Sequence, residues 1–421
     1  MATFFFYFWI HLSLFYQAAH GYWLMAANNV LTTQRIDPIV NPGVVSTHVH
    51  GILGGSNFGL NTTTDDLRAS QCTSIPIPQD KSAYWYPQLY FQWSNGTFTS
   101  VQGNPVIKAQ VLKKINAQDF SLDYLFSDTP GNTTAFPKDF RMLSGNPDLR
   151  TFDPSSFAQQ AVTFLCLDFN GKSTRFNELP KQRCPSGIRS QINFPSCWDG
   201  VNTDSPDHQS HIAFLSTGPD NGTCADPHFP ITLPRIFMEV YWVSQEFDDF
   251  RRQAAVPDQP FVFSNGDPIG YSYHADFFNG WEDGVLERAL EECNCNPYGD
   301  PSCCVAKGIF DLDQSKRCFL STIVDEATLG TLDSLPGNNP VQAHCFEEYF
   351  ANYTPALLSP AMAFTDTNVP TPTGTVSVPA QTTSIAQSAR GTCLGNSSLR
   401  PQTPRFMLLG ALILSSCWLL S

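Results

Sequence analysis

Residues 82–93 run SAYWYPQLYFQW, a stretch that consists mostly of aromatic and other apolar side chains. Three further segments are equally dense in aromatic and β-branched residues: AVTFLCLDF (161–169), HIAFLST (211–217) and RIFMEVYWVS (235–244). Gly, Pro, Asn and Asp separate these segments, which is the pattern of short strands joined by turns. The sequence therefore predicts a mainly β fold: a β-sandwich or jelly roll with long loops, in one large domain. A mixed α+β fold is the alternative.

Helical periodicity is scarce along the chain. The clearest candidate is DGVLERALEEC (283–293), in which Val285, Leu286, Ala289 and Leu290 recur at near-helical spacing. We expect few helices.

Composition divides the chain into four parts. Residues 1–21 carry an apolar run that is too short to span a bilayer, followed by small residues suited to cleavage, and they resemble a secretory signal peptide. An N-terminal membrane anchor is the alternative. Residues 22–350 have the apolar and aromatic content of one globular ectodomain.

The last two parts differ sharply from the ectodomain. Residues 351–395 are rich in Thr, Ser and Pro and poor in charge, which is typical of an O-glycosylated stalk. Residues 396–421 combine small residues, a polar spacer and an apolar tail, the pattern of a GPI-attachment signal. A short single-pass helix is the alternative. We expect an extracellular protein of the cell surface or cell wall, held at the outer leaflet of the plasma membrane by the lipid.

Glycosylation sites and cysteines agree with export, and the charge bears on the kind of partner. The chain has 13 cysteines, which default to disulfides in an oxidising compartment. The formal charge of −14, with only 24 Lys and Arg, gives no basic surface for a phosphate backbone and argues against nucleic acid as a partner. Six N-x-[ST] sequons fit a glycosylated ectodomain: Asn61, Asn95, Asn132, Asn221, Asn352 and Asn396.

Six of the cysteines crowd into the end of the ectodomain, namely Cys293, Cys295, Cys303, Cys304, Cys318 and Cys345. Their spacing does not match the C-x2-4-C pairs of zinc sites, so we expect a small disulfide knot. The cysteines outside the stalk and tail are odd in number, which leaves either a free thiol or a bridge to Cys393.

Two histidines one residue apart, His48 and His50, precede a glycine-rich turn in THVHGILGG. On a strand, residues two apart project from the same face, so both imidazoles would point together. Two further segments repeat this theme: DHQSH supplies His208 and His211, and YHAD supplies His274. Loops on a β scaffold often carry chemistry, and we expect these segments to converge in one cleft.

The residue types suggest two kinds of chemistry. Neutral imidazoles suit a divalent transition metal such as Zn or Cu, for which we select His48, His50, His211 and His274 as ligands. His211, His274, Asp276 and Tyr273 are the catalytic candidates for moving protons. His228 is expected in a turn, and Glu239, inside an apolar strand, must be paired or coordinated because burying a bare carboxylate is costly. The alternative is that all these histidines brace separate loops.

A long loop at FPSCWDGVNTDSPDHQSH (194–211) is the best candidate for a binding wall. It carries an aromatic face and groups able to hold hydroxyls, as a sugar-binding surface does: Trp198, Asp199, Asn202 and His208.

Several motifs occur together in an order that is recognisable: DPIVNPGVVSTHVHGILGG (37–55), DKSAYWYPQLYF (80–91), FRMLSG (140–145), FPSCWDG (194–200), DHQSHIAF (207–214) and GDPIGYSYHADFFNGW (266–281). Over about residues 28–345 the chain resembles the domain of unknown function nineteen-ninety-six family of secreted, mainly fungal proteins. The resemblance implies an extracellular, cell-wall setting and carries no catalytic roles.

Two functions from different classes are therefore expected. The first is a wall-facing enzyme, a hydrolase, lyase or metal-dependent oxidoreductase that acts on polysaccharide through the histidine cleft. The second is a non-catalytic carbohydrate-binding or structural wall protein. Convergence of the histidine side chains in one place distinguishes them.

Overall fold

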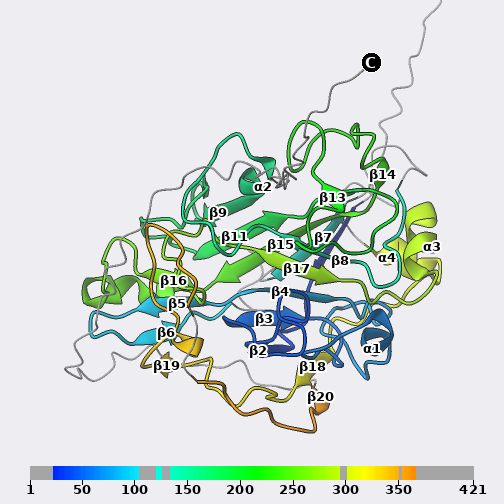
Figure 1. Ribbon diagram of the computed structural model, residues 1–421. Coiled ribbons are helices and arrows are strands. Elements are labelled where there is room, and N and C mark those ends of the chain that lie inside the picture. Colours follow the sequence, from blue (N-terminus) through cyan, green and yellow to red (C-terminus); the bar gives the residue numbers. More distant parts are fainter. Residues whose placement is uncertain (1–21, 104–119, 126–132, 294–300, 350–352, 367–421) are drawn as a thin grey trace, which may run out of the picture. The chain divides into compact units, whose positions relative to one another are not determined.

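The computed structural model describes residues 22–103, 120–125, 133–293, 301–349 and 353–366 (Figure 1). The chain divides into two compact units, residues 1–389 and 390–421, and every described residue belongs to the first. The expected signal peptide, the lipid-attachment segment, most of the stalk and the sequon at Asn132 lie outside the described residues.

Antiparallel strands in five sheets make up most of the regular structure, which confirms the prediction of a mainly β domain with few helices. The largest sheet has six strands in the order β1 (Tyr22–Ala26), β7 (Phe120–Leu125), β15 (Arg235–Trp242), β11 (Ile188–Asn193), β9 (Val162–Cys166) and β10 (Thr174–Phe176). The second has five, in the order β2 (Thr32–Gln34), β3 (His50–Leu53), β4 (Ala83–Pro87), β17 (Ala275–Phe278) and β8 (Arg141–Ser144).

Three smaller sheets and short helices complete the described part of the chain. The sheets are β16 (Phe261–Phe263), β5 (Leu89–Gln92), β6 (Phe98–Ser100) and β19 (Thr331–Leu332); β13 (Ile212–Ala213), β12 (Cys197–Trp198) and β14 (Ile231–Thr232); and β18 (Arg317–Leu320) with β20 (Ala363–Asp366). The helices are α1 (Thr64–Arg68), α2 (Phe157–Gln160), α3 (Val285–Glu292), α4 (Ser302–Ala306) and the 3-10 turns η1 (Ser244–Gln253) and η2 (Pro336–Asn338). No helix among the described residues is long and apolar enough to cross a membrane.

The four aromatic segments of the sequence all contain strands, and one of the segments is divided into two strands. The expected strand at 82–93 becomes β4 and β5, which belong to different sheets on either side of Gln88. The side-chain amide of Gln88 is buried there and donates to the carbonyls of Leu89 and Val101. The expected helix at 283–293 forms as α3.

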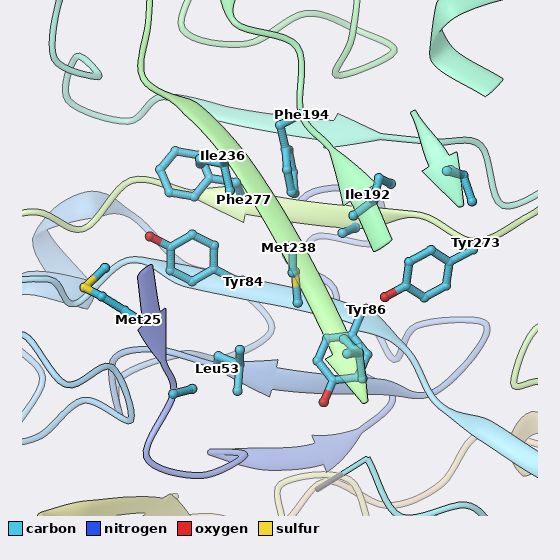
Figure 2. Close-up of a cluster of buried hydrophobic side chains, with 14 of the residues drawn as sticks. Met25, Leu53, Tyr84, Tyr86, Ile192, Phe194, Ile236, Met238, Tyr273 and Phe277 are labelled. Atoms are coloured by element: carbon cyan, nitrogen blue, oxygen red, sulfur yellow. The ribbon is translucent and has the colours of Figure 1, made fainter. Parts of the chain in front are cut away.

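The core lies between the six-stranded and the five-stranded sheet, which makes the fold a sandwich (Figure 2). From the five-stranded sheet Tyr84, Tyr86 and Phe277 point into this core, and Ile192 and Met238 face them from the six-stranded sheet. Because side chains alternate along a strand, the residues between them project from the opposite face. The outer face of the five-stranded sheet packs against loops, α1 and β18 in a second apolar cluster, and it carries the histidines.

Disulfides tie distant segments together. Cys72 pairs with Cys318, 246 residues away, while Cys166–Cys184, Cys197–Cys224 and Cys293–Cys304 close shorter loops. Cys303 and Cys345 are also disulfide-bonded. The expected knot at the end of the ectodomain is therefore wrong for Cys318, which instead joins that region to the N-terminal part of the domain.

The folded unit extends beyond residue 350, where the composition changes. Strand β20 lies in the Thr- and Pro-rich segment, yet it pairs with β18 over four residues of register. Backbone hydrogen bonds to an existing strand need no apolar run, so the composition does not mark the end of this sheet.

Candidate metal centre

Three histidines converge on the outer face of the five-stranded sheet. His50 begins β3, His48 lies two residues before it, and His274 immediately precedes β17. One ligand nitrogen from each ring can be chosen so that all three lie within 4.8 Å of one another. The ring centroids of His48 and His50 are 4.3 Å apart, and that of His274 lies 5.0 Å from His48. Both segments that the sequence indicated, H-V-H and H-A-D, thus contribute to one cluster.

Backbone carbonyls orient two of the rings. The Nδ1 of His50 lies 3.2 Å from the carbonyl oxygen of Ile36, and the Nδ1 of His274 lies 2.8 Å from that of Ser272. A carbonyl can only accept, so each Nδ1 carries the proton and donates it. The Nε2 of each neutral ring then carries a lone pair that can accept a proton or bind an ion, and that of His274 faces His48. This is the arrangement by which proteins present histidine to a metal ion.

The third ring, His48, completes the set. Its Nε2 lies 3.0 Å from the Nε2 of His274, and its Nδ1 lies 3.0 Å from the hydroxyl of Thr47. Two imidazole nitrogens bound to one ion at about 2.0–2.1 Å are themselves about 2.9–3.4 Å apart. The separation of 3.0 Å is compatible with that geometry. In the metal-free protein, a proton on His48 Nε2 would instead make this contact a hydrogen bond to His274 Nε2.

His50 Nε2 supports the metal-ligand interpretation independently. This nitrogen is buried, and among the described residues it has no hydrogen-bond partner. A buried polar atom without a partner is costly, so such atoms in native proteins have a water, an ion or a functional role to account for them. An ion between the three rings would engage it.

Burial keeps all three imidazoles neutral. The exposed fractions of His48, His50 and His274 are 5%, 0% and 2%. Burial, aided by the neighbouring rings, holds the pKa of His48 and of His50 well below the ordinary value. For His274 burial lowers the pKa to about 4. Neutral imidazole is the form that binds a metal.

A pocket of about 410 Å³ opens above two of the three rings. His48 and His274 line it, while His50 is beneath them. The remaining wall comes from loops far apart in the sequence: Asp37, Val40, Asn41, Thr47, Leu143, Pro147, Asp148, Asn265, Asn339, Gln342, Phe346, Glu348 and Tyr349. An ion held by the three rings would therefore have one side directed to a space that a small ligand can enter.

Gly145, at the end of the FRMLSG motif, holds β8 close to His274. Its φ is +81°, and a Cβ at this position would lie 2.5 Å from the carbonyl oxygen of Tyr273 and 2.8 Å from the Cα of His274. Only glycine fits such a contact in this conformation. The glycine thus permits the backbone approach that places His274 in the cluster.

Asp276 lies on the same face as His274 but outside the group of three. Its carboxyl group is buried, and among the described residues neither oxygen has a hydrogen-bond partner. Burial, with a smaller effect of Asp37, raises its pKa well above the ordinary value. Asp37 is buried too, accepts from the backbone N–H groups of Ile39 and Val40, and has a pKa raised to about 6 by burial. A pair of carboxyl groups therefore accompanies the histidines.

His211 is not part of the cluster. Its Nδ1 lies 2.9 Å from the hydroxyl of Ser205 and its Nε2 lies 3.0 Å from the carbonyl oxygen of Arg141. Both ring nitrogens are thus engaged in holding its own loop against β8, and none is free for a metal. The assignment of His211 as a metal ligand is corrected by this geometry, which resembles the bracing role of the alternative, while its catalytic role stays a prediction.

The expected binding wall at 194–211 is a closed turn. The indole of Trp198 donates to the carbonyl of Asn202, and the carboxylate of Asp199 accepts from the backbone and the amide of Asn202. His208 pairs with Asp204 at 2.7 Å. None of these side chains lines the pocket above the histidines. Their polar groups satisfy one another, so a sugar would have to displace existing bonds.

Tyr273 points away from the site. It lies in the core between the two large sheets, where Phe263 packs against it (Figure 2). The strand alternation that sends His274 outward sends Tyr273 inward. Burial raises its pKa further above the ordinary value of a tyrosine. Its proposed role as an acid is corrected on this ground.

Two other residues behave as expected. Glu239 is paired. Its Oε1 lies 2.8 Å from the Nη2 of Arg189, and the Nε2 of Gln191 donates to the same oxygen at 2.7 Å. His228 is exposed in a turn beside Asp226. Neither contributes to the site.

Several pocket residues carry no clear sequence signal. Asn265, Asn339 and Gln342 are ordinary polar residues of loops, and only the fold brings them beside the histidines. Asp37 does carry a local signal, because it opens the turn D-P-I-V-N-P, and aspartate in such a turn caps the following backbone.

The motif order noted in the sequence is matched by a family model, the Domain of unknown function (DUF1996), over residues 37–281. This range is more than half of the 421-residue chain. The chain belongs to this family. The matched range includes all three histidines of the cluster and ends at Trp281. No curated protein and no solved structure matches the chain.

Proposed function

We propose that this member of the family is a metal-dependent protein in which His48, His50 and His274 hold one divalent transition ion. The observation that carries the proposal is the convergence of three buried imidazoles, two of them with Nδ1 anchored by backbone carbonyls. Imidazole donors suit Zn and Cu, and a site with three protein ligands keeps a position open. Such an ion polarises a bound water or hydroxyl group.

The substrate that we propose is a polysaccharide of the cell wall. The pocket above the rings offers amide and carboxylate groups beside Phe346 and Tyr349, the combination that orients hydroxyls and packs on sugar rings. Hydrolysis is the favoured reaction class, because a water supplies the atoms that it adds and no further reactant is needed. The lyase and oxidoreductase classes remain alternatives for the test to separate.

An extracellular location is part of the proposal. Four disulfides between described cysteines fit an oxidising compartment. The proposed GPI anchor rests on the sequence of residues 396–421 alone. Release of the full-length protein from intact cells by a phosphatidylinositol-specific phospholipase tests it, and retention in the membrane fraction would contradict it.

Metal content is the decisive experiment. After reconstitution with Zn or Cu and dialysis, the wild-type protein is expected to retain about one equivalent, as a site with three protein ligands implies. His48→Ala, His50→Ala and His274→Ala should each lose most of it. His211→Ala is the matched control, since it removes another buried histidine that is not in the cluster.

Two further measurements guard against loss of fold. Thermal melting of each variant shows whether it is folded, and X-ray absorption of the metal-loaded wild type counts the imidazole ligands directly. A wild type that retains no ion, or a His211→Ala variant that loses it as fully as the others, would contradict the metal centre. Release of reducing ends from wall polysaccharide tests hydrolysis; binding without release would favour the non-catalytic alternative.

A further inference from the structure

The pocket above the histidines is acidic. Three carboxyl groups line it, those of Asp37, Asp148 and Glu348, and no lysine or arginine is among its lining residues. Among the described residues, none of the three takes part in an ion pair, and no hydrogen bond engages the carboxylate of Asp148 or of Glu348. Burial raises the pKa of Asp148, Arg150 lowers it, and Glu348 raises it by a smaller effect. The two carboxylates repel each other, Arg150 compensates this only on the side of Asp148, and a cation in the pocket would relieve the repulsion further.

Asn265 adds an oriented acceptor to the wall. Its Nδ2 donates to the carbonyl oxygen of Pro147 at 2.9 Å and to the hydroxyl of Ser272 at 2.8 Å. A carbonyl only accepts, and the Ser272 hydroxyl gives its own proton to Asp267, so the nitrogen end of the amide must face this way. The Oδ1 is left buried with no partner among the described residues, and the side chain is 7% exposed. A donor such as a hydroxyl or a water fits it.

The nearest arginine, Arg150, offsets part of the charge of Asp148 but has its donors engaged elsewhere. Arg150 is buried, and its guanidinium donates to the carbonyl oxygens of Pro147, Leu149, Asn265 and Gln342. Its donors therefore hold three wall segments together and do not project into the pocket. Apart from the proposed ion, an anionic ligand would find no free cationic side chain in the wall and would face the carboxyl groups of Asp37, Asp148 and Glu348.

We propose that the pocket binds a sugar unit that carries an ammonium group beside its hydroxyls, a glucosamine-type residue, and rejects anionic sugars such as uronates. Asp148 and Glu348 are the specificity-determining residues, and Asn265 accepts a hydroxyl. The proposal deepens the polysaccharide function and rests on it, because the same pocket opens onto the three histidines.

The test compares three tetrasaccharides, of glucosamine, N-acetylglucosamine and galacturonate, by calorimetric titration of the metal-loaded full-length protein. At about pH 6 both the amine and exposed carboxylates are charged. We expect the glucosamine probe to bind most tightly, the N-acetyl probe more weakly and the galacturonate probe not measurably. The affinity for the glucosamine probe should fall with added salt.

Charge-removing variants identify the residues. Asp148→Asn/Glu348→Gln keeps the side-chain shapes and should weaken glucosamine binding about 5- to 20-fold, while it leaves the N-acetyl probe nearly unchanged. Asp249→Asn/Asp258→Asn is the matched control, because it removes two exposed carboxylates that do not line the pocket. Metal content is measured on every sample.

The outcomes separate this proposal from the metal centre. A metal-loaded protein that binds galacturonate as well as glucosamine, or that binds none of the three probes, overturns the selectivity and leaves the metal centre standing. Selective glucosamine binding by a protein that retains no metal overturns the metal centre and supports the pocket. A control variant as weak as the pocket variant would also overturn the assignment of Asp148 and Glu348.

Discussion

At the level of single residues, the site depends on which nitrogen of each histidine is left free. Ile36 and Ser272 contribute only carbonyl oxygens, yet these carbonyls decide that His50 and His274 present Nε2. The pattern H-x-H predicts that two rings share a face, and this holds. It does not predict the tautomers, because these depend on backbone atoms from other loops.

Gly145 permits a contact that no other residue would allow, and its substitution tests that contact. Gly145→Ala should lower the melting temperature and weaken metal binding tenfold or more (about 1.4 kcal/mol or above), because the new methyl group displaces His274. Gly284→Ala is the control: its φ is +74°, but no atom lies within 4 Å of the added Cβ. Backbone strain alone should then cost stability and leave metal affinity unchanged; equal affinities in both variants would contradict the contact argument.

Asp37 should make stability depend on pH. Its pKa is raised by burial from 3.8 to about 6, so the folded state keeps a proton that the unfolded state has lost between these values. The stabilisation is fully present below about pH 4 and is lost as the pH rises through 6, by up to about 3 kcal/mol. In metal-free protein, the stability of the wild type relative to Asp37→Asn should fall by this amount from about pH 4 to 7, measured by denaturant unfolding of both proteins. Parallel curves for both proteins would contradict it.

At the level of elements, the alternation along β17 explains the division of roles. His274 and Asp276 face the loops, whereas Tyr273 faces the core. The period of two was visible in the sequence, and it correctly separated these residues. Which face would be buried between the sheets was not visible, because both faces of this strand carry aromatic or polar residues that could be buried.

The pairing of β11 with β15 creates a buried ion pair with a predictable cost of disruption. Arg189 contacts Glu239 and donates to the hydroxyl of Tyr241. Arg189→Met leaves the carboxylate of Glu239 buried without its cation, and we expect a loss of about 3–5 kcal/mol in unfolding free energy. Arg189→Met/Glu239→Gln should recover much of this loss, because the charge is gone. Denaturant unfolding measures both, and a double variant no more stable than the single would contradict the charge argument.

At the level of the whole molecule, loops far apart in the sequence and one long-range disulfide assemble the pocket. Its wall combines residues from near position 40, near 148, at 265 and from 339 to 349. The Cys72–Cys318 bridge fastens the N-terminal part of the domain to the segment that leads into the last of these regions. Spacing could not reveal this partner, because a cysteine pairs with whichever thiol the fold brings near.

Disulfides that close long and short stretches of chain should differ in their effect on stability. In the chain-entropy account, a bridge across 246 residues stabilises by about 5 kcal/mol and one across 18 residues by about 3 kcal/mol. Cys72→Ala/Cys318→Ala should therefore lower the melting temperature more than Cys166→Ala/Cys184→Ala does. Calorimetry of the two variants measures the order, and the reverse order would show that local packing outweighs chain entropy here.

The sequence by itself determined the class of fold, its main strands, the helix at α3 and the two segments, H-V-H and H-A-D, that meet at the candidate centre. These features depend on local periodicity, which each segment carries in its own residues. Only the tertiary structure decided that His211 braces a loop, that Tyr273 is buried in the core, and that Asp37, Asn265 and Glu348 share a pocket. Such relations depend on which distant segments pack together, and the free energy that selects them is spread over the whole core.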